Sequence, residues 1–424
     1  MGAGRSRSGW WTGAWAIERR GMGQRVIFHC DLNCFFASVE LLDKPALWDV
    51  PVAVCGDPKS RHGIILAKNE PAKKRGVQTA ETVWQAKKKC PVLVLLPPHH
   101  ELYEVYSRRV NEIYGRFTDL VEPFGIDESW LDVTGSLHLF GGDARALADR
   151  IRATVKAETG LTVSVGVSFN KVFAKLGSDL KKPDATTVIP PEGWRDIVWP
   201  LPVGDMLFAG RSTQRVLGQY GIETIGQLAA CPEEMAEQLL GKMGGQLWRY
   251  ANGLDNSPVR PGHQREPVKS VGNGTTFPAD LVRWEQIRQG LAPLCDSVAT
   301  RLRRQGLYAG GVSVTLKGAD FKTVSRQTRL DEPTHLMRDI WETAQELARQ
   351  IWKAPTPIRA MTVTALYVTE DGQAYRQLDL LGQASAKRSE RQEKLESAVD
   401  AIREKYGSGA ITFGQRQRTT DHEE

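Results

Sequence analysis

The pattern of apolar and polar positions predicts a mixed α/β unit in the first half of the chain. Residues 25–31 and 51–56 are short and almost wholly apolar, which is typical of buried strands. The other strands and helices expected in this unit cover residues 120–126, 129–133 and 161–168, and residues 34–42, 100–117 and 143–158. Their order is close to a ferredoxin-like split βαβ core, with a small separate insert after the second strand.

The pattern changes near residue 203, where short helices surround Gly221 in a helix-hairpin arrangement. Residues 252–267 are rich in Gly, Pro and Asn without an apolar period, so we predict a linker there. A second α/β unit follows, with a strand at 268–277, a helix at 283–304, two further strands, a helix at 336–353 and a strand at 358–367. Beyond it the chain is charged and expected to be mostly exposed, with one helix around 388–406.

Composition places the chain among multidomain globular proteins. Its 424 residues suggest two to four domains, and 41% hydrophobic with 25% charged residues argues against a disordered chain. No apolar run approaches the roughly 20 residues that cross a bilayer. The net charge of +6 permits a polyanionic partner without requiring one. Six scattered cysteines match no zinc spacing and indicate a reduced cytosolic compartment.

The N-terminal residues do not resemble a targeting signal. Residues 1–21 contain arginines and three tryptophans but no apolar core of about 7–15 residues, which a signal peptide needs. We expect residues 1–23 to be a disordered extension, and Met22 would be a natural start.

Carboxylates stand at the ends of two strands that should be neighbours. Asp31 ends the first strand, while Asp127 and Glu128 lie between two later strand signals. The negative charges of such a cluster repel one another, and a divalent cation would offset this repulsion. Mg²⁺ suits the site because it binds through a few carboxylates and substrate phosphates. Two such ions support nucleotidyl transfer. From spacing alone the alternative stays open that Asp31 caps a helix and the other two acids form a polar turn.

The two acidic segments resemble a known family. FHCDLNCFFASVE followed by PFGIDESWLDVTG is similar to the palm of Y-family DNA polymerases of the DinB branch. The similarity continues through TVWQAKKKCPVLVLLP (fingers), SVGVSFNKVFAKLGSDLKKPDATTVI (palm), LPVGDMLFAGRSTQRVLGQYGIETIGQLA (thumb) and PVKSVGNGTTFPADL (little finger). It covers roughly residues 24–368 in the order of the family.

The resemblance implies an α+β multidomain fold with a ferredoxin-like palm, a small fingers insert, a helical thumb with a helix-hairpin-helix, and a C-terminal α/β little finger. The implied boundaries are 24–56 and 98–190 for the palm, 57–97 for the fingers, 191–255 for the thumb, 256–267 for the linker, 268–368 for the little finger and 369–424 for a flexible tail.

The resemblance also assigns site residues. The metal-binding carboxylates of the family are matched by Asp31, Asp127 and Glu128, and a further metal contact is matched by the backbone carbonyl of Leu32. These groups would bind two Mg²⁺ ions, which Mn²⁺ could replace. Phe36 matches the ring that excludes a 2′-hydroxyl from the incoming sugar. Three further residues are assigned to the nucleotide pocket: Phe35, Lys73 and Lys182. Lys182 matches a triphosphate contact, whereas the ring of Phe35 is better suited to the core.

The chain departs from the family in the fingers. Where relatives commonly have Tyr and Arg as triphosphate contacts, AKNEPAK places Glu70 and Lys73. A carboxylate there should repel phosphate unless it is paired, and we expect Lys73 to take the phosphate contact. Asn33 stands where many relatives have an aspartate, at a position that is not a metal ligand.

Contacts to DNA and to a sliding clamp are assigned by the same resemblance. Backbone N–H groups near Gly210 would contact phosphates, although Phe208 replaces the usual first glycine of that hairpin. The basic residues expected on the little-finger strands are Lys269, Arg326 and Arg329, of which the last two should point to opposite faces. The peptide with Gln377, Leu378, Leu380 and Leu381 resembles a bacterial sliding-clamp motif, the alternative being a last edge strand.

The sequence thus predicts an error-prone translesion DNA polymerase without proofreading. Its expected partners are primer-template DNA, dNTPs and the clamp, with no membrane, for a monomer in the bacterial cytoplasm near the nucleoid. Two other classes remain as alternatives. One is a nucleotide cyclase, which would not need the thumb and the second α/β unit to bind a DNA duplex. The other is a non-catalytic mutagenesis accessory factor, which should lack the three carboxylates.

Overall fold

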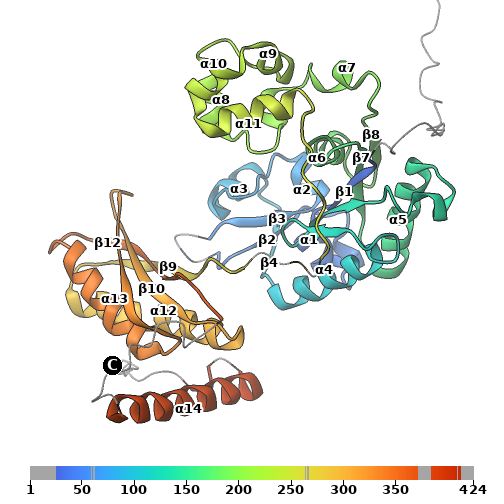
Figure 1. Ribbon diagram of the computed structural model, residues 1–424. Helices are drawn as coiled ribbons and strands as arrows, with labels where there is room; N and C mark the ends of the chain where they lie inside the picture. Colours follow the sequence, from blue (N-terminus) through green and yellow to red (C-terminus); the bar gives the residue numbers. More distant parts are fainter. Residues whose placement is uncertain are drawn as a thin grey trace, which may run out of the picture. The chain divides into compact units, whose positions relative to one another are not determined.

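The computed structural model contains two compact units, residues 1–265 and 266–424, each of which is described by itself (Figure 1). It describes residues 25–411 apart from 59, 61–62, 263, 265–266, 371–382 and 408, and only the backbone of 383–390. The expected N-terminal extension and clamp peptide lie outside the described residues. In the described part of the chain no helix is long and apolar enough to cross a membrane.

A five-stranded sheet with the order β5-β6-β1-β7-β8 forms the palm. Its strands are β1 (Ile27–Leu32), β5 (Val121–Pro123), β6 (Glu128–Asp132), β7 (Val163–Ser168) and β8 (Thr186–Val188). Its helices are α1 (Phe35–Leu41), α4 (His100–Tyr114), α5 (Ala144–Thr159) and α6 (Lys171–Leu180), with 3₁₀ turns at Pro45–Leu47 and Leu137–Phe140.

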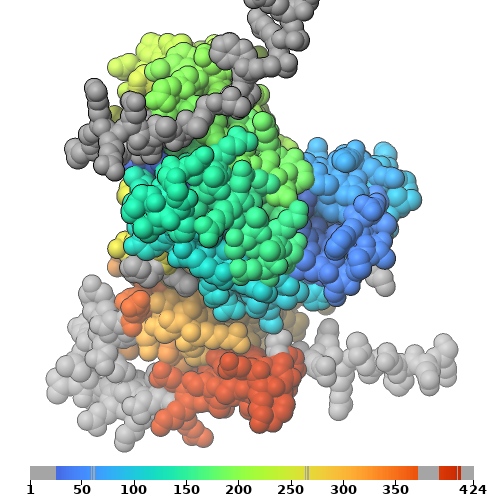
Figure 2. All heavy atoms as spheres, turned by 90° about the vertical axis from the view of Figure 1, so that its right-hand side faces the viewer, coloured from blue at the N-terminus to red at the C-terminus, as the bar shows by residue number. Residues whose placement is uncertain are grey.

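Strand β1 separates the two layers of the palm because alternate residues point to opposite faces. Phe28 and Cys30 pack into a core built with α4 and α5, which Figure 2 draws in cyan and in blue-green. Ile27 faces the other way, toward Trp130 of β6 and Ala174 of α6. His29 and Asp31 follow Ile27 in the same alternation, so β1 delivers two polar side chains to the α6 side.

The fingers have their own three-stranded sheet, β3-β2-β4. It contains β2 (Val52–Cys55), β3 (Ile65–Lys68) and β4 (Val94–Leu96), with helices α2 (Glu70–Lys74) and α3 (Val83–Lys89). The prediction that residues 51–56 form a strand is confirmed, but their placement in the palm is wrong. β2 pairs with β3 and β4 instead, and a short apolar run does not reveal which sheet it joins.

The thumb is a cluster of short helices around one hydrophobic core. These are α7 (Trp194–Val198), a 3₁₀ turn (Val203–Asp205), α8 (Arg211–Gly218), α9 (Ile225–Ala230), α10 (Glu233–Leu240) and α11 (Lys242–Ala251). The chain then crosses the palm. Val259 is buried beside Trp130, and the Arg260 amide donates to Glu122 Oε2 at 2.8 Å. This part of the predicted linker is therefore fixed to the palm.

The second unit is a four-stranded antiparallel sheet with the order β11-β10-β12-β9. Its elements are β9 (Ser270–Leu281), α12 (Trp284–Arg304), β10 (Ala309–Gly318), β11 (Thr323–Thr334), α13 (Met337–Ile351) and β12 (Ile358–Leu366). Apolar residues of both helices and of the sheet form its core. All six elements agree with the segments predicted from the sequence.

Within the flexible tail expected over residues 369–424, the helix expected around 388–406 is confirmed, and its described part is docked where exposure was expected. Helix α14 (Gln383–Tyr406) lies against the helices of its unit, in red beside orange in Figure 2. Its inward side is charged. Glu396 pairs with Arg303 of α12, Asp400 Oδ2 lies 2.7 Å from Arg303 Nε, and Arg403 pairs with Asp296 at 2.9 Å. The high charge that suggested exposure is instead used for docking.

Candidate active site

The structure brings the three carboxylates to one end of the palm sheet. Asp31 of β1 is the register partner of Glu128 of β6, and the Leu32 amide donates to the Asp127 carbonyl at 3.0 Å. Asp31 is buried, whereas Asp127 and Glu128 are half-buried. A cavity of about 340 Å³ opens beside them, and Asp31, Leu32 and Asp127 line it. The predicted juxtaposition follows directly from the pairing of β1 with β6.

Burial and mutual repulsion set the protonation of these acids. Burial raises the pKa of Asp31 to about 7, against the stabilising charge of Lys182, and the Glu128 charge adds to the rise. Burial, and then Glu128, also raise the pKa of Asp127. For Glu128, burial is outweighed by His29 and Lys175, which hold its pKa at about 2. Two of the three acids therefore keep raised pKa values, Asp31 even though Lys182 pairs with it.

The donor set suits a divalent cation with hard oxygen ligands. Asp31, Asp127 and the Leu32 carbonyl offer only oxygen, which is the chemistry that Mg²⁺ prefers, and a cation there would relieve the raised pKa values. Within the described residues no three His, Cys, Asp or Glu side chains converge as a ready metal group. One physical reason is that Asp31 and Glu128 each turn an oxygen toward a lysine.

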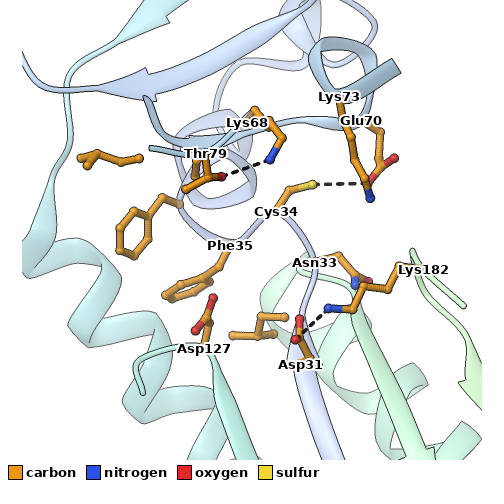
Figure 3. A pocket seen from close by; sticks show the side chains of 14 residues that line it. Asp31, Asn33, Cys34, Phe35, Lys68, Glu70, Lys73, Thr79, Asp127 and Lys182 are labelled. Atoms are coloured by element: carbon orange, nitrogen blue, oxygen red, sulfur yellow. Dashed lines mark hydrogen bonds and ion pairs between the residues drawn. The ribbon is translucent and has the colours of Figure 1, made fainter. Parts of the chain in front are cut away.

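Lys182 reaches the carboxylates from the end of α6. Its Nζ lies 2.8 Å from Asp31 Oδ2 and 2.8 Å from Asp179 Oδ1, and its side chain is 24% exposed (Figure 3). Asn33 is buried and fully engaged with the fold. It donates to Ser164 Oγ at 3.0 Å and accepts from the Asp184 amide at 2.8 Å, so its amide is held away from any ligand role.

Phe36 forms one wall of the cavity and has a rigid support. Its ring stacks on Tyr103 with centroids 4.1 Å apart and planes within 13°. The Tyr103 hydroxyl donates to Glu40 Oε1 at 2.6 Å, which fixes the supporting ring. Phe35 is only 3% exposed and belongs to the palm core. Phe35 also borders the cavity, but the free ring surface is that of Phe36.

The fingers contribute the opposite wall of the cavity (Figure 3). Lys73 Nζ lies 3.4 Å from Glu70 Oε1, and the Cys34 thiol donates to the same oxygen at 3.5 Å. Lys68 donates to Thr79 Oγ1 at 3.1 Å. The Glu70 carboxylate is thus paired with Lys73 and Cys34, which offsets the negative charge that would repel the expected phosphate. The Lys73 side chain remains half exposed at the cavity.

The other predicted DNA contacts are not among the residues that line this cavity. Gly210 is the N-cap of α8, and the exposed Phe208 before it has φ of 69°, a left-handed conformation that favours glycine. Lys269 directly precedes β9. Arg329 pairs opposite Gly311 and Arg326 opposite Val314, so the two arginines point to opposite faces of β11, as their spacing predicts.

Three residues near the carboxylates were not anticipated. Tyr103 supports Phe36, while His29 and Lys175 approach Glu128. Burial lowers the pKa of His29, against the opposing effect of Glu128. The signal for Lys175 was present in the sequence, because Lys171, Lys175, Ser178 and Lys182 repeat at intervals of four, three and four residues, which is one face of a helix.

Comparisons with known proteins agree with this geometry. The impB/mucB/samB family matches residues 30–179, and the C-terminal domain of that family matches residues 268–380. DNA polymerase IV of Acetivibrio thermocellus is 45% identical over 92% of this chain and 97% of its own length. DNA polymerase IV 1 of Bacillus subtilis is 38% identical over 92% of each chain.

A solved structure shares the fold. A Y-family DNA polymerase chimera of Dbh and Dpo4 superposes with a TM-score of 0.73, covering 81% of this chain and 99% of that one at 22% identity. The matched domains, the relatives of nearly full length and the shared architecture lead to one assignment. The chain belongs to the impB/mucB/samB family, as a Y-family DNA polymerase of the DNA polymerase IV (DinB) type.

Proposed function

We propose that this chain is a template-directed DNA polymerase of the translesion type, which adds dNTPs to a primer 3′-hydroxyl and has no proofreading activity. The observation that carries the proposal is the meeting of Asp31, Asp127 and Glu128 beside a cavity that Phe36 borders. A carboxylate cluster of this kind depends on divalent metal. Its oxygen donors favour Mg²⁺, with Mn²⁺ as a substitute.

Each side chain has a part in nucleotidyl transfer. Asp31, Asp127, Glu128 and the Leu32 carbonyl would hold two Mg²⁺ ions, which supply charge stabilisation to the attacking and leaving oxygens. The primer 3′-hydroxyl gives its proton to solvent water as the O3′–Pα bond forms. The bond from Pα to the bridging oxygen breaks, and pyrophosphate leaves with that electron pair. Lys182 and Lys73 face the triphosphate across the cavity and offset its charge.

Selection of deoxynucleotides follows from the support beneath Phe36. Tyr103 stacks against the ring, and Glu40 holds Tyr103 through its hydroxyl, so the ring has little freedom to move aside. A 2′-hydroxyl on the incoming sugar would meet a fixed aromatic surface. The gate therefore acts by steric exclusion, without a hydrogen bond to the correct sugar.

We assign the grip on primer-template DNA to Gly210 in the thumb and to Lys269, Arg326 and Arg329 in the second unit. Phosphate contacts of this kind give affinity without sequence preference, which a template-directed enzyme needs. We assign clamp binding to residues 377–381, and propose a monomer that works at the bacterial nucleoid. Removing Leu380 and Leu381 should leave basal extension intact and abolish stimulation by a sliding clamp, and unchanged stimulation would argue against this assignment.

The test is primer extension on an undamaged template with Mg²⁺, comparing dNTPs with rNTPs. Wild type should add dNTPs, and Asp127→Ala should lose this activity by a factor of a thousand or more, by analogy with other removals of a group essential to the chemical step. Phe36→Leu should gain rNTP incorporation, because a smaller side chain leaves room for the 2′-hydroxyl.

Asp119→Ala is the matched control, since Asp119 is an exposed acid of the same unit that does not border this cavity. Extension that survives Asp127→Ala would remove the carboxylates from the reaction. A wild-type chain that binds primer-template but adds nothing with Mg²⁺ or Mn²⁺ would favour an accessory factor instead.

A further inference from the structure

Helix α6 lays a row of polar side chains over the palm sheet. Four contacts repeat along one face of the helix and its end: Lys171 Nζ to Glu122 Oε2 at 2.8 Å, Lys175 Nζ to Glu128 Oε2 at 2.7 Å, Ser178 Oγ to His29 Nδ1 at 2.8 Å, and Lys182 Nζ to Asp31 Oδ2 at 2.8 Å. Two of these four contacts reach Glu128 and its neighbour His29, and the proposed reaction gives His29 no role of its own.

One oxygen of Glu128 is held from two sides. Lys175 donates to Oε2, and Nε2 of His29 lies 3.4 Å from the same atom. The Lys175 side chain is 16% exposed, and His29 is completely buried. No contact of this kind is recorded for Oε1 among the described residues. Glu128 is therefore fixed through one oxygen and offers the other.

His29 has an arrangement of protons that suits this task. A neutral imidazole carries one N–H, and its Nδ1 lies beside the Ser178 hydroxyl. If Nδ1 carried the proton, the lone pair of Nε2 would face the Glu128 carboxylate in a buried site, and the two would repel each other. The single Ser178 hydroxyl proton has two acceptors in reach, Nδ1 and the Lys175 carbonyl oxygen at 2.7 Å. In the arrangement in which it goes to Nδ1, Nε2–H points toward Glu128. Among the described residues Nε2 has no hydrogen-bond partner, because its distance of 3.4 Å to Glu128 Oε2 is too long for a well-formed hydrogen bond. The imidazole packs against the ring of Trp130, with ring centroids 5.3 Å apart and planes at 63°.

We propose that His29 and Lys175 are positioning residues that immobilise Oε2 of Glu128, so that Oε1 is directed to the divalent cation and the reacting primer terminus. Ser178 orients the imidazole in this arrangement. The inference rests on the proposed polymerase function and adds to it the part of the chain that aims the third carboxylate. Partners that orient a metal ligand in this way typically change metal affinity or activity by about 10–100-fold when they are removed.

His29→Leu tests the imidazole without changing the charge of the site. Binding of Mn²⁺ to the full-length chain, followed by electron paramagnetic resonance without DNA or dNTP, should weaken about tenfold. In primer extension, kcat should fall by a similar factor while KM for dNTP stays within twofold, because the nucleotide contacts are intact. His29→Gln, which can again donate to Glu128, should recover most of the loss.

Lys175→Met tests the ammonium through kcat. Loss of a positive charge would by itself favour Mn²⁺ binding, so a fall in kcat with unchanged KM reports lost orientation and not lost attraction. Lys175→Arg keeps the charge and should restore most of kcat. Lys181→Met is the matched control, because Lys181 lies exposed at the end of the same helix and should behave as wild type.

The outcomes separate the inference from the function on which it rests. If His29→Leu does not fold by circular dichroism, Ser178→Ala replaces it and should lower kcat and Mn²⁺ affinity in the same sense. The inference alone would be overturned if the wild type is active and Lys175→Met has the same kcat. The same holds if kcat and Mn²⁺ affinity are unchanged in His29→Leu or in Ser178→Ala. A wild-type chain that adds no nucleotide would overturn the proposed function together with the inference.

Discussion

At the scale of single residues, two of the three carboxylates are matched by lysines, Glu128 by Lys175 of α6 and Asp31 by Lys182 just beyond that helix. Asp31 and Glu128 could be predicted as neighbours, because the first strand and the later hairpin lie side by side in a ferredoxin-like sheet. Their partners Lys182 and Lys175 could not be assigned in the same way. A lysine at a helical spacing is ordinarily a solvated face, and only the packing of α6 against the sheet shows which acid each lysine meets.

Glu70 and Lys73 make a testable pair on the fingers side of the cavity. Lys73→Ala should raise KM for dNTP about tenfold or more, because a hydrogen bond to a charged group contributes about 1.5–3 kcal/mol. Glu70→Gln should lower KM, because it removes a charge that repels the triphosphate while its amide oxygen still accepts from Lys73. With the site open to water this repulsion is roughly 1 kcal/mol or less, or about fivefold in KM. Steady-state kinetics at fixed primer-template measures both.

Lys74→Ala is the control for this pair, since Lys74 is the exposed neighbour that does not border the cavity. A rise of KM in Glu70→Gln as large as in Lys73→Ala would show that Glu70 itself assists nucleotide binding. The repulsion argument would then be wrong.

At the scale of elements, the approach of α6 to the sheet depends on a glycine. A Cβ on Gly166 of β7 would lie 1.8 Å from the Ala174 carbonyl oxygen and 2.4 Å from the Ser178 amide nitrogen, both in the backbone of α6. The sequence shows Gly166 within an apolar strand but not which helix comes close to it. The same limit explains why β2 was assigned to the wrong sheet, because strand pairing is a tertiary choice.

Gly166→Ala should therefore lower stability and activity together. Overpacking costs typically 1–3 kcal/mol, and here the clash is with backbone, which cannot rotate away. The shift of α6 would move Lys175 and Lys182 away from their acids, so kcat should fall with the melting temperature. Differential scanning calorimetry and primer extension on the same preparation measure the two effects.

Gly218→Ala provides the comparison, because a Cβ there meets nothing within 4 Å at the end of α8. It should be neutral or slightly stabilising, since alanine lowers the entropy of the unfolded chain. A Gly166→Ala protein as stable as Gly218→Ala would show that β7 and α6 can separate freely.

At the scale of the whole molecule, each unit has a separate hydrophobic core. The number, type and order of elements in the second unit could be predicted because long amphipathic helices and alternating strands carry strong periodic signals. Helix α14 could be predicted as a helix but not as a docked one. Its docking depends on complementary charges, such as Arg303 with Glu396, that are far apart in sequence.

Arg303→Met should release α14. Arg303 and Glu396 side chains are 7% and 0% exposed, and removing one partner of a buried pair costs about 3–5 kcal/mol. Hydrogen exchange of the α14 amides should accelerate about a hundredfold or more. Arg304→Met, at the exposed neighbouring position, should leave exchange unchanged. Equal exchange in both variants would mean that α14 does not depend on this pair.

Helix α14 turns charged side chains inward and apolar ones outward, and this affects the solubility of the protein. Deleting a packed helix ordinarily exposes a hydrophobic surface, and the shortened protein then aggregates. Among the described residues, α14 contributes nothing to the hydrophobic core, and it exposes Leu395, Ile402 and Tyr406. A chain that ends before α14 would lose these three apolar side chains from its surface and expose charged groups of α12 to water. Such a shortened protein should remain at least as soluble as the complete one at high concentration.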